Sequence, residues 1–409
     1  MNSPSNHGPR ASGAAGIAGA ATTILFGRAL RAFADGYVAV LLPAYLLALG
    51  FGRFDVGFLG TATLAGSALA TIAVGSVGYR WPQRRLLLAA ALLMAATGAG
   101  FAGFASFWPL AIVAFVGTLN PSSGDVSVFL PLEYARLAAA AEGDARTVLF
   151  ARYTLTGSLC SALGALASGI PAWVALRTGV TLLDALRAMF VLYGLIGAII
   201  WFLYGGLAAV EGEAAQQPAP LGPSRRTVFK LAALFSIDAF AGGLVVNSLL
   251  ALWLFDRFGL SLAAAGAFFF WAGLLTAGSQ WVAPRVARRI GLLNTMVFTH
   301  IPANVCLILA ALAPSVELSL ALLFARSALS QMDVPTRSAY VMSVVTPAER
   351  AAAASFTAVP RSLASAASPS LGGALFAAGF LAAPLILCGS LKIAYDLALL
   401  FSFRHHARL

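Results

Sequence analysis

The sequence predicts an all-α polytopic membrane protein with twelve transmembrane helices in two pseudo-symmetric halves of six helices each. Three observations lead to this fold class: twelve long apolar stretches, too few charges for a soluble domain, and a second half that repeats the first. Of the 409 residues, 60% are hydrophobic and 10% are charged, whereas soluble proteins carry about 25% charged residues. The composition therefore excludes a soluble globular protein.

Each apolar stretch is long enough for one helical crossing, which needs ~20 predominantly apolar residues. Helix is the only assignment that satisfies the backbone in lipid, because the stretches lack the alternation of barrel strands. The first stretch contains Arg28 and Arg31, which is wrong for a cleavable signal peptide, so we expect it to stay in the mature protein. The predicted spans are 22–49, 54–78, 86–105, 109–132, 147–170, 185–207, 228–254, 262–283, 290–312, 316–337, 350–376 and 382–403.

Basic residues are distributed unequally between the loops. The loops after even-numbered spans and the C-terminal tail hold most of the arginines, whereas the opposite loops hold only Arg53, Arg177, Arg187 and Arg257. Because positively charged loops stay in the cytoplasm, we predict cytoplasmic termini in a bacterial inner membrane. The same asymmetry explains the net charge of +11 without a nucleic-acid partner.

The cysteines and histidines indicate neither a disulfide framework nor a metal site. Three cysteines lie in three different spans, where a thiol behaves as a small hydrophobe: Cys160, Cys306 and Cys388. Apart from an adjacent pair in the tail, the histidines have no metal-ligand spacing: His7, His300, His405 and His406. We predict no metal and no cofactor, and no enzymatic activity, since no catalytic cluster is visible and no ATP-binding Gly-x-x-x-x-Gly-Lys-Ser/Thr loop is present.

An internal repeat flanks the polar, proline-containing segment 211–226, which reads as a flexible linker. At offsets of 203 or 204 residues, three features of the first half recur: Asp35 as Asp238, Gly75-Ser76 with Arg84-Arg85 as Gly278-Ser279 with Arg288-Arg289, and Ser158–Ala162 as Ser362–Ala366. The predicted units are a tail (1–21), an N-terminal half (22–208), a cytoplasmic linker (209–227), a C-terminal half (228–403) and a tail (404–409). Repeated six-helix halves are typical of transporters with a midplane substrate site.

The spans, the linker and the basic loops after spans two and eight together resemble the major facilitator superfamily from about residue 22 onward. The family loop signature, Gly-x-x-x-Asp-Arg-x-Gly-Arg-Lys/Arg, is matched at Gly75, Arg80 and Arg85. Tyr79 and Pro82 replace its Asp and second Gly, which puts the Asp-centred charge contacts of the family in doubt. The resemblance implies that five arginines gate the inward opening, with a topology role as the alternative: Arg80, Arg84, Arg85, Arg288 and Arg289.

Two further stretches resemble parts of this family. Pro369-x-x-Gly372-Gly373 is similar to the end of an antiporter signature, although small residues also simply permit close helix packing, which we favour. The segments 331–337 and 346–350 resemble uncharacterised bacterial members and name no substrate.

Ionisable residues inside spans are costly and are therefore functional candidates. The resemblance implies that spans one, four, seven and ten line the cavity. The break at Asn120-Pro121 exposes backbone groups that can coordinate a substrate, and a simple proline kink is the alternative. The candidates for substrate binding or coupling are Arg31, Asp35, Asn120, Asp125, Asp238, Asn247, Arg326, Asp333 and Arg361.

Helical spacing assigns partners to some of these charges. Arg31 and Asp35 share one helical face, either as a structural pair or in a functional role. Lys392 and Asp396 have the same spacing on span twelve and are predicted to pair structurally. Asp238 has no charged helical neighbour, which favours a neutral acid and makes it our first choice for the proton carrier, with Asp35 second.

These features predict a monomeric secondary active transporter that works by alternating access in a lipid bilayer on a small-molecule substrate. The leading hypothesis is proton-coupled efflux of a small organic compound. Transport of an organic or inorganic anion is the alternative, suggested by Arg31, Arg326 and Arg361. Pairing of Arg361 with Asp333 would weaken this alternative. A non-transporting receptor would need a sizeable outer domain, and none is visible in the sequence.

The orientation is testable by thiol labelling. Cysteines introduced at Ser3 and at Gln216 should resist a membrane-impermeant thiol reagent in intact cells, because the basic loops require a cytoplasmic location for both positions. Both should react after permeabilisation. Labelling of either position in intact cells would overturn the orientation.

Overall fold

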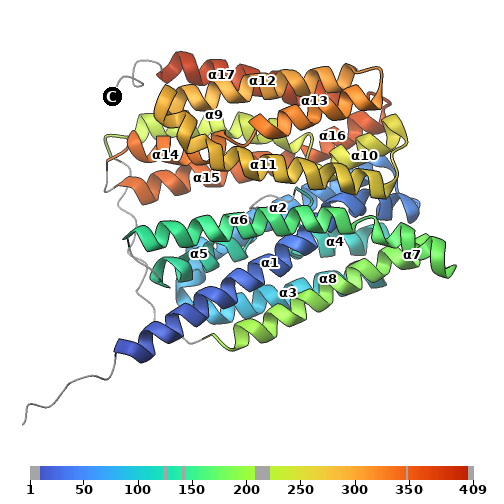
Figure 1. Cartoon of the computed structure of the whole chain (residues 1–409), viewed down its shortest axis with the longest axis horizontal. Coiled ribbons are helices and arrows are strands. Elements are labelled where there is room, and N and C mark those ends of the chain that lie inside the picture. The colour runs from blue at the N-terminus through green and yellow to red at the C-terminus, as the bar shows by residue number, and fades with distance from the viewer. Residues whose placement is uncertain (1–9, 123–126, 141–142, 208–221, 347–348, 404–409) are drawn as a thin grey trace, which may run out of the picture.

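The computed structural model describes residues 10–122, 127–140, 143–207, 222–346 and 349–403, which are almost wholly helical. The helices run along the longest axis of the molecule (Figure 1). We call one end the terminus end, because α1 (Arg10–Ala48) begins there and α17 (Ala383–Phe403) ends there. The opposite end is called the distal end.

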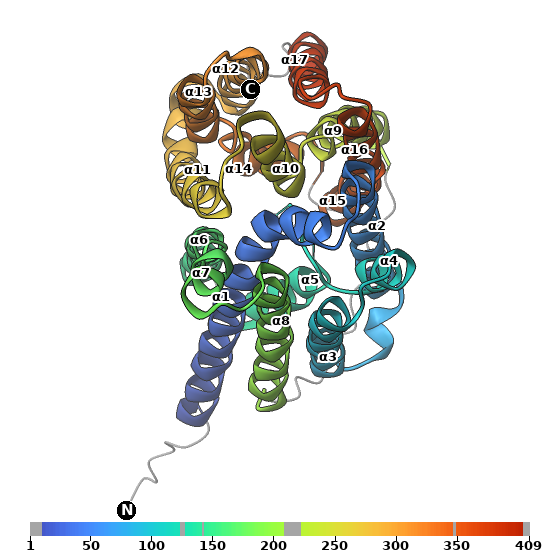
Figure 2. The same ribbon diagram turned by 90° about the vertical axis from the view of Figure 1, so that its right-hand side faces the viewer.

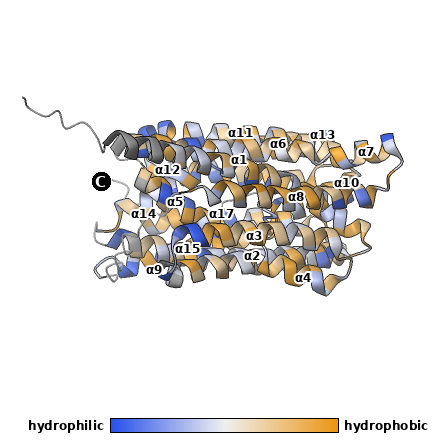
Figure 3. Cartoon of the chain, turned by 90° about the horizontal axis from the view of Figure 1, so that it is seen from below, coloured by the Kyte–Doolittle hydropathy of each residue, from blue (hydrophilic) through white to orange (hydrophobic). Residues whose placement is uncertain are grey.

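The exposed surface of the bundle is apolar over most of its length. Large side chains such as Leu92, Phe202 and Trp281 are 61%, 73% and 70% exposed, which suits contact with lipid. Hydrophilic residues gather towards the ends of the helices and around α15 (Arg350–Ala367), as Figure 3 shows. The outer face is thus suited to a bilayer and not to water.

Nine helical segments of the described chain are long and apolar enough to cross a membrane. Five are single helices: α2 (Arg53–Val77), α3 (Gln83–Gly103), α8 (Leu182–Gly205), α11 (Leu262–Ile290) and α12 (Leu292–Leu312). Two more are α1 and α17. The remaining two are each formed by a pair of successive helices: α6 (Gly143–Ala167) with α7 (Ile170–Thr178), and α9 (Arg225–Gly243) with α10 (Asn247–Phe258).

The other three predicted spans cross as pairs of shorter helices. They are α4 (Phe107–Val116) with α5 (Phe129–Ala140), α13 (Val316–Leu329) with α14 (Asp333–Ser343), and α15 with α16 (Pro369–Ala377). With these three, the prediction of twelve passes is confirmed. Spans four and ten are the fourth of each half, so the interruption is itself repeated.

Several helix ends differ from the predicted ends of the spans, because hydropathy marks the apolar part of a helix and not the residues by which the helix extends beyond it. α1 is already helical at Arg10, inside the predicted tail 1–21. α5 continues to Ala140, beyond the predicted end of span four at 132. α7 likewise carries span five to Thr178.

The helices form two bundles, which Figure 2 shows from the distal end. We call α1–α8 the N half and α9–α17 the C half. Within the halves, α3 packs on α8 and α1 on α6, while α9 packs on α15 and α12 on α17. Most of the buried apolar side chains belong to one cluster that runs through both halves.

The halves meet along α2 with α16 and along α6 with α11. At the first of these crossings Gly57 faces Gly373: a Cβ on Gly57 would lie 2.5 Å from the Pro369 carbonyl oxygen. A Cβ on Gly373 would lie 2.9 Å from the Arg53 carbonyl oxygen. The Pro369-x-x-Gly-Gly stretch therefore serves close helix packing here, as the favoured alternative held.

Two polar contacts between the halves lie in the distal part of the molecule. Arg53 Nε pairs with Asp256 Oδ2 at 2.6 Å, and the Ser370 and Thr61 hydroxyls are 2.8 Å apart. At mid-depth the Ser248 amide donates to the Pro121 carbonyl at 3.1 Å. The broken region of span four is thus held against α10 of the C half.

Glu349, outside the membrane-spanning segments at the start of α15, fixes the point where the linker enters α9. Its carboxylate accepts hydrogen bonds from the Gly222 amide (2.5 Å), the Ser224 hydroxyl (2.7 Å) and the Thr346 hydroxyl (2.6 Å). The hydroxyls of Thr346 and Ser224, followed by the backbone amides, lower the pKa of Glu349 to about 2. The ionised form is therefore the one that holds α9 to α15.

We expect Glu349→Gln to lower the thermal stability of the purified protein at neutral pH, because an amide cannot accept all of these bonds. A group with a lowered pKa contributes stability above its ordinary pKa of 4.5 and loses it as the pH falls towards 2. The difference in Tm between the two proteins should therefore shrink as the pH falls below 4.5. A pH-independent difference, or none, would contradict this role.

Candidate functional site

The C half encloses six charged or titratable side chains from four helices, which we call the C-half charge cluster: Asp238 on α9, His300 on α12, Asp333 and Arg337 on α14, and Lys392 and Asp396 on α17. At its centre, Asp238 contacts Lys392 Nζ through Oδ1 at 2.5 Å and Arg337 NH1 through Oδ2 at 3.1 Å. Arg337 also pairs with Asp333 at 3.2 Å. The cluster thus joins spans seven, nine, ten and twelve.

Burial makes the charge balance of this cluster important. The Asp238, Asp333 and Arg337 residues are 3%, 5% and 7% exposed. Charges taken out of water are tolerated only when they are paired and hydrogen-bonded. Three carboxylates face two fixed cations, so the cluster has an excess of acid when His300 is neutral.

His300 connects two of the carboxylates. Its Nδ1 lies 3.0 Å from both oxygens of Asp396, and its Nε2 lies 4.0 Å from Asp238 Oδ1. The ring also packs edge-on against Tyr395, with 6.3 Å between ring centroids. Although α12 and α17 belong to spans that the family resemblance makes peripheral, they supply half of this cluster.

The N half holds a smaller buried group, the N-half charge cluster: Arg31 on α1, Glu133 on α5, Tyr153 on α6 and Tyr204 on α8. Arg31 NH2 pairs with Glu133 Oε2 at 2.7 Å. The Tyr153 hydroxyl donates to the same oxygen at 2.6 Å, and the Tyr204 hydroxyl donates to Oε1. Glu133 is fully buried, and its carboxylate is therefore well satisfied.

The two clusters share one geometry with opposite signs. In each half an ion pair joins the first span to the terminus-side part of the fourth. The fourth span supplies the acid Glu133 in the N half and the cation Arg337 in the C half, 204 positions apart. The first span correspondingly supplies Arg31 or Asp238.

Two predictions about partners are wrong. Asp238 is not an unpaired acid, because α14 and α17 bring Arg337 and Lys392 against it. Lys392 and Asp396 are not each other's partners: Lys392 contacts Asp238, and Asp396 contacts His300. Helical spacing places residues on one face but does not say which neighbouring helix meets that face.

Arg31 forms its ion pair with Glu133. The prediction had considered Asp35 as the partner of Arg31. Asp35 is half-buried and acts electrostatically on Arg31 and on Tyr37. Asp35 therefore acts on Arg31 through its electric field. The direct ion pair of Arg31 is with Glu133 on α5.

Asn120 stabilises the break in span four. Its side-chain Oδ1 accepts bonds from the Ser122 amide and hydroxyl at 3.1 and 2.7 Å, an Asx-type turn. Asp125 lies outside the described residues. Asn247, the first residue of α10, is half-buried, and its side chain has no hydrogen bond to a described residue.

Two predicted arginines differ from the paired ones. Arg326 on α13 is half-buried, its Nε has no partner, and it acts electrostatically with Cys388. Arg361 on α15 is exposed, and no carboxylate of the described residues lies within 4.0 Å of it. Pairing of Arg361 with Asp333 is thus excluded, because Asp333 is held by Arg337.

The five candidate gating arginines lie near the terminus end. Arg84 donates to the Gly205 carbonyl at the end of α8. Arg85, Arg288 and Arg289 are exposed, as is Arg80. Arg288 and Arg289 line a surface pocket of about 440 Å³ on α11.

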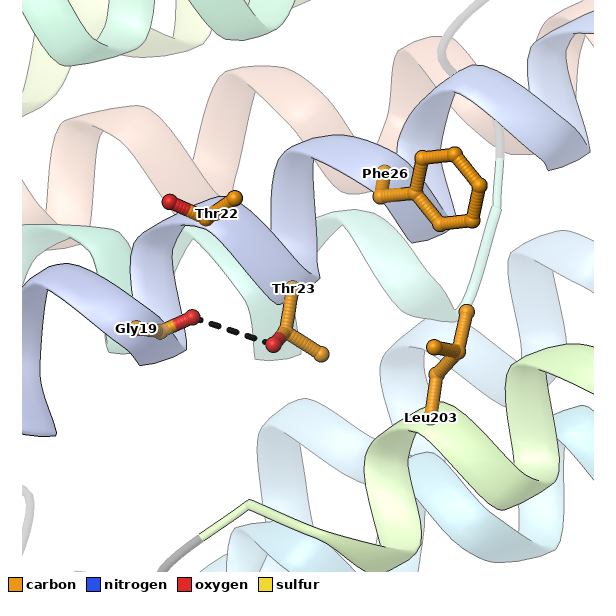
Figure 4. Close-up of a pocket in the computed structure, with 5 residues that line it drawn as sticks. All are labelled: Gly19, Thr22, Thr23, Phe26 and Leu203. Carbon is orange, nitrogen blue, oxygen red and sulfur yellow. Dashed lines mark hydrogen bonds between the residues drawn. The ribbon is translucent and has the colours of Figure 1, made fainter.

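A second surface pocket, of about 490 Å³, lies between α1 and α8 (Figure 4). Gly19, Thr22, Thr23, Phe26 and Leu203 line it. The Thr23 hydroxyl already donates to the Gly19 carbonyl at 3.0 Å, and no charged side chain reaches the pocket. It offers little to recognise a polar substrate.

Sequence reasoning missed several members of the clusters. Glu133 follows the predicted end of span four, and Arg337 is the last residue of predicted span ten, so neither lies well inside a predicted span. His300 has no metal-ligand neighbours in the sequence, and no metal-binding group is found in the described residues. The repeat offset between Glu133 and Arg337 was the one available signal.

Comparison with known proteins agrees with this architecture. A model of the Major Facilitator Superfamily matches residues 24–369. An uncharacterised membrane protein of Saccharomyces cerevisiae is 25% identical over 410 residues, which cover 91% of this chain and 92% of that protein.

Solved transporters share the fold. The nucleoside transporter NupG has a TM-score of 0.70 at 15% identity, covering 94% of this chain and 99% of that one. An inward-facing bacterial homologue of the human lysosomal transporter Spinster has a TM-score of 0.66 at 13% identity, covering 97% and 96%. The human organic anion transporter MFSD10 has a TM-score of 0.62 at 17% identity, covering 94% and 99%.

We expect Glu133→Gln to destabilise the protein by about 3–5 kcal/mol, because it leaves Arg31 buried without its counter-charge. The double variant Arg31→Met with Glu133→Gln should recover most of this loss. Unfolding in mixed detergent and SDS micelles measures the difference.

Asp184→Asn is the matched control, because Asp184 forms an exposed pair with Arg187 at 3.5 Å and exposed pairs contribute about 0–1 kcal/mol. If the double variant is no more stable than Glu133→Gln alone, the ion pair is not the main role of Glu133.

Proposed function

The chain belongs to the Major Facilitator Superfamily, and we propose that it is a proton-coupled secondary transporter that exports a small organic compound by alternating access. Membership supports a transporter in a lipid bilayer with a small-molecule substrate. Proton coupling and the direction of transport are the parts proposed here.

The observation that carries proton coupling is the C-half charge cluster. Titratable groups buried at membrane depth are costly and are retained for transport of ions or protons. With three carboxylates against Arg337 and Lys392, the cluster can accept a proton without acquiring a net positive charge. Asp238 stays a coupling candidate, now as the centre of a network and not as an isolated acid.

The contacts between the halves support an inward-facing state. The Arg53–Asp256 and Thr61–Ser370 contacts lie in the distal part, while each charge cluster is internal to one half. If the terminus end is cytoplasmic, as the arginines favour, the distal contacts close the outer side. In that arrangement Arg80 and Arg288 would gate the inner side when the halves close there. The alternative is that these arginines only set the topology.

A second candidate function is transport of an organic anion. Arg361 is the observation that favours it, since this exposed cation on α15 has no carboxylate partner among the described residues. A guanidinium binds carboxylate or phosphate groups through two parallel hydrogen bonds. The fold is shared by transporters of nucleosides and of organic anions, so it does not choose between the candidates.

Transport by the purified protein in proteoliposomes, with and without an imposed pH gradient, tests these functions on a panel of neutral, cationic and anionic compounds. We expect the gradient to drive accumulation of at least one compound. Asp238→Asn should abolish gradient-driven accumulation and spare exchange of that compound, because exchange needs no net proton movement.

Asp184→Asn serves as the control, because Asp184 is exposed and lies in the N half. Accumulation that survives Asp238→Asn would remove Asp238 from the coupling mechanism. If the gradient drives none of the compounds while exchange is measurable, the protein is not proton-coupled. Selective loss of anion exchange in Arg361→Gln would support the anion candidate.

A further inference from the structure

The contact between His300 and Asp396 is the place in the C-half charge cluster where one proton changes the bonding. A neutral imidazole has one N–H donor and one acceptor nitrogen. Both oxygens of Asp396 lie 3.0 Å from Nδ1, so with Asp396 ionised and the ring neutral the N–H must be on Nδ1. The lone pair of Nε2 then faces Asp238 Oδ1, 4.0 Å away, and two acceptors oppose each other.

We propose that His300 and Asp396 together form the proton-binding site of this transporter, with Asp238 as the group that senses the proton. The proposal rests on the proposed function and names the residues of its coupling site. A proton taken from water onto Nε2 turns the opposed acceptors into a donor and an acceptor. The same proton leaves to water when the cluster opens to the other side.

The charges around His300 favour this uptake. Asp238, Asp333 and Asp396 outnumber the bonded cations Arg337 and Lys392, and a protonated His300 balances them. Arg361 also acts electrostatically on Asp238 and Asp333, but it forms no ion pair with a described carboxylate and therefore does not occupy an acceptor of the cluster.

The remaining groups on the neighbouring helices do not add a carboxylate at this point. Tyr395 on α17 packs against the His300 ring, and Arg326 on α13 acts with Cys388. The cations of α11 are exposed towards the terminus end: Arg285, Arg288 and Arg289.

Asp238 Oδ1 links the proton site to the rest of the C half. Lys392 Nζ contacts this oxygen at 2.5 Å, and His300 Nε2 faces the same oxygen at 4.0 Å. A cationic His300 therefore competes with Lys392 for one acceptor. Because Asp238 also holds Arg337 through Oδ2, a change at α12 and α17 reaches the α9–α14 ion pair between spans seven and ten.

Titration of His300 in the full-length protein tests the proposal directly. The chain has four histidines, so replacing His7, His405 and His406 with alanine leaves His300 alone, provided that purification uses a tag without histidine. The ¹⁵N spectrum of histidine-labelled protein in nanodiscs then reports the protonation state and tautomer of this one ring. We expect the spectrum to change from that of a neutral Nδ1–H tautomer to that of a doubly protonated ring within the pH range in which the protein stays folded.

Two substitutions should move the midpoint in opposite directions. Asp396→Asn removes the counter-charge and should move the spectral change to lower pH, whereas Lys392→Met removes the competing cation and should move it to higher pH. Lys392→Arg keeps the charge and should leave the midpoint near that of the parent. A structural histidine would show no such opposite shifts.

A ring that keeps one protonation state across this range, or a midpoint that neither substitution moves, would overturn the proposal. The transport assay separates this failure from failure of the proposed function. Proton-driven accumulation with a His300 that does not titrate disproves the site and leaves the function standing. A titrating His300 without any proton-driven transport supports proton binding at the site and refutes the coupling.

Discussion

The structure depends on the pairing of charges that the helices bury. In each half, one ion pair joins the first span to the fourth: Arg31 with Glu133, and Asp238 with Arg337. All four residues are at most 7% exposed, so neither member of a pair can be left alone without a large cost. The fourth spans are interrupted, and both pairs hold the piece nearer the terminus end, α5 or α14, against the first span.

The two pairs differ in their surroundings, and this difference separates their roles. Glu133 accepts hydrogen bonds from Arg31, Tyr153 and Tyr204, so the N-half pair balances one carboxylate with one cation. Asp238 shares its cations with Asp333 and has a histidine beside it. Our proposal of proton binding in the C half rests on this difference, since both halves otherwise have the same fold.

The sequence allowed the twelve passes and the repeated halves to be predicted, because hydropathy and repeat spacing are properties of short segments. It also identified Arg31, Asp238 and Asp333 as buried charges. Their partners could not be predicted, since Glu133 and Arg337 lie 102 and 99 positions away in the chain. Periodicity describes one face of one helix, whereas the packing of α9 against α14 and α17 decides what that face meets.

The placement of the pairs also bears on how the halves move. Each buried charge cluster is contained in one half, so a rigid-body rotation of one half against the other breaks neither. The contacts that join the halves are weaker: Arg53 and Asp256 have side chains 41% and 15% exposed, and such pairs contribute about 0–1 kcal/mol. At the crossing of α2 with α16, Gly57 and Gly373 bring the two backbones together, so no bulky side chains interdigitate at this point. Under the proposed alternating access, the polar contacts that must change between the halves are therefore weak, while the buried ion pairs keep each half intact.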